Sequence, residues 1–193
     1  MRTSRNPDLR PFITRAISTT HEMEPGMPIP DDDPTRELTV SGRDDPVVAH
    51  IFLAGDTYSV LVTGEQTAGR YCLIDMEIPP GGGPPPHRHD FEEMFTILSG
   101  EIAFTFRGVT TTVAAGNTVN IPANAPHNFV NRSDVSARML CLCSPAGQEE
   151  FFDRVGDRIP TRTSPPPELT AEQIAERRTL AAELAPVYAT EML

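Results

Sequence analysis

Two histidines one residue apart stand just before a pair of glutamates in the stretch GPPPHRHDFEEMFTILSGE, residues 83–101. If this stretch is a β-strand, residues of equal parity share one face, so His87, His89 and Glu93 project to the same side. Two imidazoles and one carboxylate on one face are the core of a site for a first-row transition metal. Such a core needs a ligand from another segment, and His127 is the other histidine in a comparable strand setting.

The spacing of these residues resembles the two sequence motifs of the cupin superfamily, a group of small β-barrel proteins. The first motif, G-x5-H-x-H-x3-4-E-x6-G, is matched by Gly81, His87, His89, Glu93 and Gly100. The second motif, G-x5-P-x-G-x2-H-x3-N, is matched by Gly116, Pro122, His127 and Asn131. Asn124 stands where the second motif has glycine. Because asparagine tolerates left-handed backbone, we expect this turn to survive.

The resemblance implies that His87, His89, Glu93 and His127 are the four ligands of one divalent transition-metal ion. Imidazole with carboxylate suits Fe, Mn, Ni, Co, Cu or Zn, so the spacing does not identify the metal. We expect Glu93 to be the catalytic residue, because it could accept a proton from a substrate hydroxyl. Its neighbour Glu92 would face outward on a regular strand.

Three further polar residues near or outside these motifs are expected to be structural. We expect Asn131 to make hydrogen bonds that stabilise the fold rather than to bind metal. His21 and His50 lie outside both motifs, and we interpret both as structural.

Residues that share a face with the ligands are expected to line a substrate pocket. They are Phe95 and Ile97 beyond Glu93, Phe129 beyond His127, and Cys72, Ile74 and Met76, which we place on the opposite sheet. Such a pocket is largely apolar and suits an aromatic or similarly unpolar small molecule. The alternative for each of these residues is an ordinary place in the core.

Three cysteines make an odd number, which argues against a disulfide framework. Cys141 and Cys143 form a C-x-C inside the apolar run ARMLCLCSP. We interpret them as two small buried residues on one face of a strand. The alternative is a soft-metal pair, which lacks further cysteines nearby in the sequence.

Short runs of β character follow one another between Val47 and Cys143. They are VVAHIFL, YSVLVT, RYCLIDMEI, MFTIL, EIAFTF, GVTTTV, NTVNI, HNFVN and ARMLCLC, with Gly, Pro, Asn or Asp at most of the joins. This pattern predicts an all-β antiparallel sandwich or barrel. The resemblance implies more specifically a cupin double-stranded β-helix, a jelly-roll barrel, over residues 46–146.

The two ends of the chain have different compositions from the barrel. Residues 1–45 are predicted to form an extended N-terminal arm, because they are rich in charge and proline and bury little apolar surface. Residues 147–193 are predicted to form a C-terminal helical extension. Its first helix is expected in QEEFFDRVGD, with Gly156 as the stop, and Thr170 with Gln173 resembles a capping box that opens a second helix.

Charge and composition exclude several classes of function. The net charge is −11 with a pI near 4.8, so the basic footprint for nucleic acid or an anionic membrane is missing. All sixteen positive side chains are arginine, which excludes Schiff-base and lysine-nucleophile mechanisms. No apolar run approaches the ~20 residues that span a bilayer, and the N-terminus lacks the apolar core of a secretory signal. We therefore expect a cytoplasmic protein.

Within the superfamily, residues 83–101 most resemble the small single-domain cupins related to quercetin 2,3-dioxygenase. This resemblance implies a metal-dependent dioxygenase that combines O₂ with an enolisable or aromatic small molecule. One alternative is a non-redox metal cupin, an isomerase, cyclase or lyase that works by Lewis-acid enolisation. Another is a cupin that binds a small molecule without turnover. Association is common in this superfamily, so a homodimer is expected.

Overall fold

The computed structural model describes residues 29–193, which divide after Pro34 into two units: the described end of the first unit, residues 29–34, and the second unit, Thr35–Leu193. Of the first unit, residues 29–34 are described; they are exposed and contain no helix or strand. The rest of the predicted arm up to residue 28, including His21, lies outside the described residues. Residues 35–45 form turns and irregular chain, and the first strand begins at Ala49.

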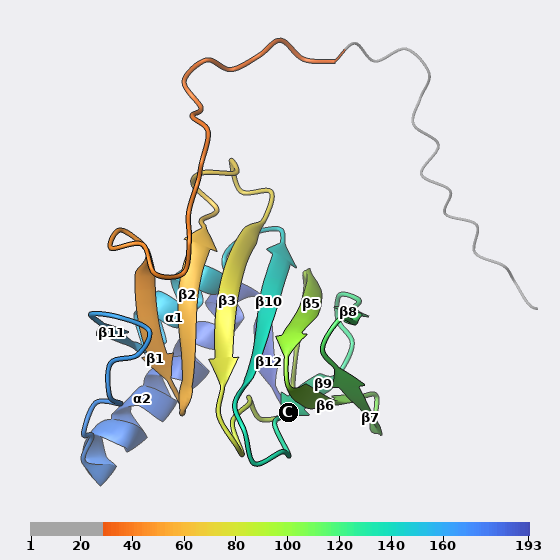
Figure 1. Ribbon diagram of the computed structural model, residues 1–193, viewed down its shortest axis with the longest axis vertical. Helices are drawn as coiled ribbons and strands as arrows, with labels where there is room; N and C mark the ends of the chain where they lie inside the picture. The colour runs from red at the N-terminus through yellow and green to blue at the C-terminus, as the bar shows by residue number, and fades with distance from the viewer. Residues whose placement is uncertain (1–28) are drawn as a thin grey trace, which may run out of the picture. The chain divides into compact units, whose positions relative to one another are not determined.

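Two antiparallel sheets make up the second unit, which confirms the predicted all-β class. The larger sheet has the order β11-β1-β2-β3-β10-β5-β8, and Figure 1 shows β1, β2, β3, β10 and β5 side by side. Its strands are β11 (Asp157–Ile159), β1 (Ala49–Leu53), β2 (Asp56–Val62), β3 (Cys72–Ile78), β10 (Ala137–Ser144), β5 (Glu92–Ser99) and β8 (Thr118–Ile121). The smaller sheet has the order β12-β4-β9-β6-β7. Its strands are β12 (Thr190–Met192), β4 (His87–His89), β9 (His127–Val130), β6 (Glu101–Phe106) and β7 (Val109–Ala114).

All nine predicted runs contain a strand, but two details of the prediction were wrong. Residues 83–101 contain two strands, β4 and β5, where one was predicted. The strand is interrupted at Asp90 and Phe91, and β4 and β5 belong to different sheets. In addition, β3 lies in the same sheet as β5, with β10 between them, so Cys72, Ile74 and Met76 lie in the sheet opposite the three histidines but not opposite Glu93. The strands β11 and β12 were not predicted.

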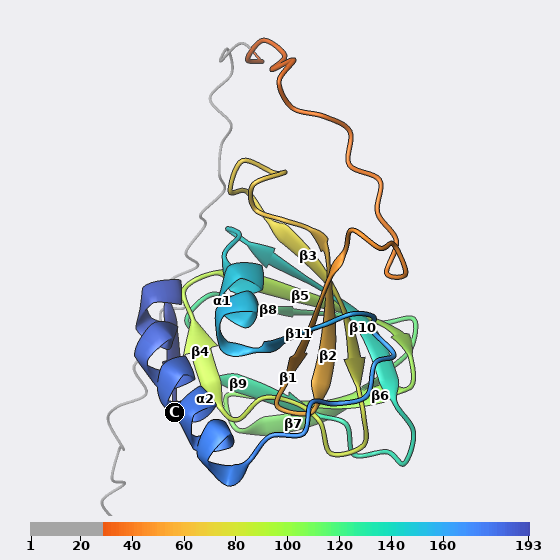
Figure 2. The same cartoon turned by 90° about the vertical axis from the view of Figure 1, so that its left-hand side faces the viewer.

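The core lies between the two sheets, which Figure 2 shows curving around a common interior. Strand β10 shows how the sequence builds it: Ala137, Met139, Cys141 and Cys143 are buried and alternate with partly exposed residues. This alternation is the period-two pattern of a strand with one face toward a core. Each large apolar side chain buried in this way stabilises the fold by roughly 1.5–3 kcal/mol.

Two turns hold the ligand-bearing segments in place. Asn124 adopts left-handed backbone with φ 66°, as expected, and its amide N–H donates to the carbonyl of His89 at 2.7 Å. Gly83 has φ 128° and packs directly on the backbone of Phe129, where a Cβ atom would overlap the carbonyl oxygen. The loop before β4 therefore lies against β9, which is the strand that carries His127.

The C-terminal residues form more than the predicted helices. Helix α1 (Gln148–Val155) ends at Gly156 as predicted, and the ring of its Phe152 stacks on Tyr58 at 4.4 Å between centroids. Helix α2 (Ala171–Leu184) opens with the predicted capping box of Thr170 and Gln173. The 3-10 helix η1 (Ala185–Tyr188) then leads into β12. Within residues 29–193, no helix is long and apolar enough to cross a membrane.

Candidate metal centre

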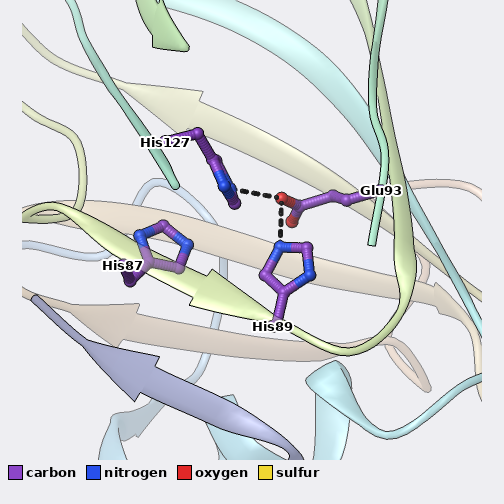
Figure 3. A group of neighbouring side chains, drawn as sticks. All are labelled: His87, His89, Glu93 and His127. Atoms are coloured by element: carbon purple, nitrogen blue, oxygen red, sulfur yellow. Dashed lines mark hydrogen bonds and ion pairs between the residues drawn. The ribbon is translucent and has the colours of Figure 1, made fainter. Parts of the chain in front are cut away.

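Three histidines and one glutamate meet between the two sheets. Strand β4 supplies His87 and His89, β9 supplies His127, and Glu93 comes from β5 in the larger sheet. His87 and His127 are register partners in neighbouring strands. All four side chains are buried, and their potential ligand atoms lie within 4.8 Å of one another. Figure 3 shows His89 and His127 directed at the Glu93 carboxylate, with His87 beside them.

Backbone carbonyls orient all three imidazoles in the same way. The Nδ1 atoms of His87, His89 and His127 lie 2.9, 3.0 and 2.9 Å from the carbonyl oxygens of Pro85, Phe91 and Ala125. A carbonyl oxygen can only accept a hydrogen bond, so each Nδ1 carries the proton. The Nε2 atoms are then left for a ligand or a second proton. Hydrogen bonds of this kind are the usual outer support of metal-binding histidines.

The Glu93 carboxylate is the acceptor at the centre of the group. Its Oε2 lies 3.0 Å from His89 Nε2 and 3.2 Å from His127 Nε2. Burial alone would raise the pKa of Glu93, but the hydrogen bonds from His127 and His89 outweigh it and hold this pKa below its usual range. Glu93 is therefore an ionised carboxylate inside an apolar barrel, a state that requires a nearby positive charge.

The pKa values of His87 and His127 are shifted in opposite directions. Burial, and next the proximity of His127, lower the pKa of His87 to about 4, so His87 is neutral at pH 7. Burial also lowers the pKa of His127, but its hydrogen bond with Glu93 outweighs burial and the pKa is raised. Without a cation, a proton on the His127 side of the group balances the charge of Glu93. A metal ion could take the place of that proton.

The donor set fits a divalent transition-metal ion. Two donors that lie at right angles about 2.1 Å from one ion are about 3.0 Å apart, close to the Glu93–His89 and Glu93–His127 distances. Imidazole nitrogen with one carboxylate suits first-row metals rather than Mg²⁺ or Ca²⁺, which prefer oxygen ligands. The structure thus brings together all four residues predicted as ligands, as a buried group that could bind a metal ion.

A protein-family model matches the segment of the chain that contains these four residues. The Cupin domain family matches residues 74–143, a segment that contains all four residues of the site. Residues 74–143 form a cupin domain. No curated protein sequence matched the chain.

Some solved structures are similar to a longer part of this chain than residues 74–143. The polyketide cyclase RemF from Streptomyces resistomycificus is similar at 21% identity and a TM-score of 0.51, over 76% of this chain and 97% of that one. A predicted oxalate decarboxylase from Thermotoga maritima shares 19% identity with a TM-score of 0.49, over 55% and 99%. KdgF from Halomonas sp. shares 14% with a TM-score of 0.46, over 52% and 89%. The family match and the likeness to RemF support the cupin fold, and the resemblance to quercetin 2,3-dioxygenase-related proteins stays a prediction.

The residues around the cupin motifs take the places expected for them. Asn131 donates from Nδ2 to the carbonyls of Ile78 and Val135, both at 2.8 Å, and so makes structural hydrogen bonds. Glu92 is exposed and accepts a hydrogen bond from Asn120. His50 is buried outside the metal-ligand group, with Nδ1 2.9 Å from the hydroxyl of Ser59.

The six predicted pocket residues belong to the hydrophobic core. Phe95, Ile97, Phe129, Cys72, Ile74 and Met76 are all at most 3% exposed. A groove of about 230 Å³ lies instead beside them, lined by Phe104, Phe106, Val109, Thr111, Val113, Val119, Asn120 and Ile121. Its residue Phe104 has ring contacts with Phe95 and Phe129, at centroid distances of 5.3 and 5.7 Å. The groove therefore reaches the aromatic residues next to Glu93.

Two supports of the cupin site were missed in the sequence. The ring of Phe91 stacks on His89 with centroids 3.7 Å apart and planes within 4°. Strand β12 pairs with β4 along its whole length, placing Thr190, Glu191 and Met192 opposite His89, Arg88 and His87. Phe91 could have been found from its place inside the motif. The three residues of β12 carry no sequence signal strong enough to predict a strand.

Proposed function

We propose that the protein is a metal-dependent dioxygenase that acts on an enolisable aromatic or similarly apolar small molecule. The observation that supports metal dependence is the orientation of three imidazoles by backbone carbonyls, with every Nε2 left for a ligand beside one buried carboxylate. The use of O₂ rests on the resemblance of residues 83–101 to cupins related to quercetin 2,3-dioxygenase. The proposed ligands are His87, His89, Glu93 and His127.

A divalent transition-metal ion held by these residues would supply Lewis acidity toward a substrate oxygen and, if redox-active, electron transfer with O₂. Glu93 has the second role in this proposal, that of a general base for a substrate hydroxyl. While His127 and His89 donate to it, its lowered pKa makes it a weak base. A bound cation would replace these hydrogen bonds as the main influence and would keep a carboxylate ligand ionised. In this proposal Glu93 therefore accepts the proton only while its carboxylate is not bound to the ion.

The surroundings of Glu93 favour an apolar substrate. Phe95, Phe104 and Phe129 form a cluster of aromatic rings with centroids 5.3 to 5.7 Å apart. Ile121, which lines the groove, is the register partner of Glu93. We propose that the substrate enters through this groove and that its walls exclude water from the carboxylate. At about 230 Å³ the groove is below the roughly 300–1,000 Å³ of typical ligand pockets, which favours a small substrate or one that extends into solvent.

A non-redox cupin enzyme is the second candidate. It would use the same four residues and the same Glu93 base to form an enolate, and would need no O₂. One observation favours this candidate: RemF, whose likeness covers 76% of this chain, is a polyketide cyclase. A cupin that binds a small molecule without turnover would also use the same groove.

Elemental analysis of the purified protein tests the metal centre. We expect about one equivalent of a transition metal per chain, and loss of at least nine-tenths of it in His87→Gln. His50→Gln is the matched control, because His50 is also a buried histidine but lies outside the group. Equal metal content in both variants would contradict the proposed ligand set.

Oxygen consumption tests the reaction. The metal-loaded protein is incubated with a panel of flavonols and smaller enolisable aromatic compounds in air and under strict anaerobiosis. We expect O₂ and substrate to be consumed together in air, and neither by His87→Gln. Turnover that persists without O₂ would establish the non-redox candidate. A tightly bound compound without product would establish the binding protein instead.

A further inference from the structure

A second set of metal-ligating side chains lies directly behind Glu93. Cys72 on β3 is the register partner of Cys143 on β10, and Cys143 is the register partner of Glu93 on β5. These three residues therefore form a row across three neighbouring strands, where directly opposite side chains are about 4.5–5.5 Å apart. Cys141, two residues along β10, projects to the same face. All three cysteines are free and at most 1% exposed.

The tertiary structure supplies what the C-x-C sequence lacked. A pair of cysteines in one strand is a poor metal site, because two thiols leave most of the coordination sphere empty. The fold adds Cys72, the register partner of Cys143 from 71 residues earlier in the chain, and it adds the carboxylate of Glu93. Three sulfur atoms and one carboxylate oxygen are enough ligands for a closed tetrahedral site.

The distances among Glu93, Cys141 and Cys143 match three edges of a tetrahedron around one ion. With metal–sulfur distances of about 2.3 Å, two thiolates of a tetrahedral site lie about 3.8 Å apart, and a thiolate and a carboxylate oxygen about 3.5 Å apart. Cys141 Sγ lies 3.6 Å from Cys143 Sγ. Glu93 Oε1 lies 3.3 Å from Cys141 Sγ and 3.8 Å from Cys143 Sγ. Glu93, Cys141 and Cys143 thus lie close to coordination distances already, and the Cys72 side chain would have to move toward them to complete the site.

Glu93 offers a different oxygen to each set of ligands. Its Oε2 faces His89 and His127, while its Oε1 faces the two thiols of β10. A carboxylate in this position can contribute one oxygen to each of two neighbouring ions. The imidazole side suits borderline first-row metals, and the thiol side suits softer cations.

We propose that Cys72, Cys141 and Cys143, with Oε1 of Glu93, form a second metal site that binds a thiophilic divalent cation of the Zn²⁺ or Cd²⁺ type. This site is separate from the histidine group but shares Glu93 with it. The inference goes beyond the proposed dioxygenase function and does not depend on it, because the thiol ligands come from other residues.

The protonation of the thiols agrees with a cation-binding role rather than a nucleophilic one. The hydrogen bond with Cys143 lowers the pKa of Cys141, but burial and the Glu93 carboxylate outweigh it and raise this pKa to about 12. The pKa of Cys143 is raised well above its ordinary value, first by its hydrogen bond with Cys141 and also by burial. Protonated thiols are poor nucleophiles, whereas a bound thiophilic cation displaces the protons and forms thiolates.

Titration of the full chain with Cd²⁺ tests the second site. The protein is stripped of metal with a chelator, kept reduced and titrated without O₂. Equilibrium dialysis with elemental analysis measures bound Cd²⁺, and near-ultraviolet absorbance measures thiolate-to-cadmium charge transfer. We expect two equivalents of Cd²⁺ per wild-type chain and a charge-transfer band that saturates with one of them.

Paired variants assign each equivalent to its ligands. His87→Gln combined with His127→Gln should bind one equivalent and keep the charge-transfer band. Cys141→Ser combined with Cys143→Ser should bind one equivalent and lose the band. If the histidine group binds no metal, the wild-type protein should bind only one equivalent of Cd²⁺ and should still show the charge-transfer band. That result would contradict the proposed function and support this inference.

Two results would overturn the second site. One is wild-type protein that binds Cd²⁺ without a charge-transfer band. The other is loss of the band in the histidine double variant, which would mean one mixed site instead of two. Should the cysteine variant fail to fold, ¹¹³Cd NMR of the wild type decides alone. A resonance in the thiolate range supports the site, and resonances confined to the nitrogen and oxygen range refute it.

Discussion

At the scale of single residues, short-range geometry fixes the state of the imidazoles. Each histidine of the site donates from Nδ1 to a carbonyl only two residues away in the chain, at Pro85, Phe91 or Ala125. The local backbone around each histidine therefore selects one tautomer, and no contact with a partner strand is needed for this selection. The result is that the Nε2 atoms are preorganised, which lowers the cost of binding an ion.

Asp56 is a buried residue whose charge the fold does not balance. It is 1% exposed, accepts one hydrogen bond from the Tyr58 hydroxyl at 3.1 Å, and its Oδ1 finds no hydrogen-bond partner among the described residues. Burial raises the pKa of Asp56 to about 7, and the hydrogen bond from Tyr58 opposes this shift only in part. The folded protein thus keeps a proton that the unfolded chain releases near pH 4.

This shift predicts how the stability of the protein depends on pH. Between about pH 4 and pH 7 the folded state binds one proton more than the unfolded state, so the free energy of unfolding falls as pH rises through this window. In Asp56→Asn the free energy of unfolding does not fall in this way, because the asparagine side chain does not titrate. We expect the variant to gain roughly 2–4 kcal/mol relative to the wild type between pH 4 and pH 8. Urea denaturation at both pH values measures this gain, and a constant difference would refute the assignment.

At the scale of elements, the strand that carries two of the three histidines depends on the C-terminal residues. Strand β4 shares one register pair with β9 but three with β12. Two further backbone hydrogen bonds flank it, from Asp90 N to Ala189 O at 2.9 Å and from Leu193 N to Pro86 O at 3.0 Å. On the exposed side, Arg88 Nε donates to Glu191 at 2.6 Å. Thus β12 completes the ladder that positions His87 and His89.

Truncation after Ala189 should loosen the metal centre without removing a ligand. We expect the affinity for the metal to fall about 10- to 100-fold, the range found when outer supports of ligands are lost. The control is Glu191→Ala, which removes only an exposed ion pair worth at most about 1 kcal/mol and should leave affinity within about twofold. Competition with a chelator measures both. A folded truncated protein with unchanged affinity would show that β9 alone holds β4.

At the scale of the whole molecule, the groove is where the two sheets leave their interior accessible. Its lining comes from β6 and β7 of the smaller sheet and β8 of the larger one. Strands β7 and β8 are the terminal strands of their sheets, so no further strand covers the interior there. This placement explains why a route to the aromatic rings near Glu93 opens at this side of the barrel. A homodimer and a cytoplasmic location stay predictions.

Blocking the groove should separate substrate binding from metal binding. Val119 lines the groove and is partly buried, whereas Val135 is 58% exposed and does not line it. We expect Val119→Phe to raise KM about tenfold or more, because the larger ring occupies space that the substrate needs, with metal content unchanged. Val135→Phe is the control and should behave like the wild type. Unchanged KM in Val119→Phe would place substrate entry elsewhere.

The sequence predicted the site better than its surroundings. His87, His89, Glu93 and His127 could be selected because motif spacing is a local property of the sequence, although the parity argument for Glu93 failed where the strand is interrupted at Asp90 and Phe91. The pocket residues could not, because parity says which face a residue is on and not whether that face is hollow. Cys72, Ile74 and Met76 do face the interior, but β10 inserts between β3 and β5 and makes them close-packed core.

The sequence by itself determined the β-rich class, the capped second helix and four residues that could hold a metal, since period, spacing and capping are written in consecutive residues. Only the tertiary structure decided that β12 supports the histidine strand, that Cys72 joins Cys141 and Cys143, and that Glu93 presents one oxygen to each group. The physical reason is that strand order in a sheet follows from packing of the whole chain, and pairs residues that no local pattern connects.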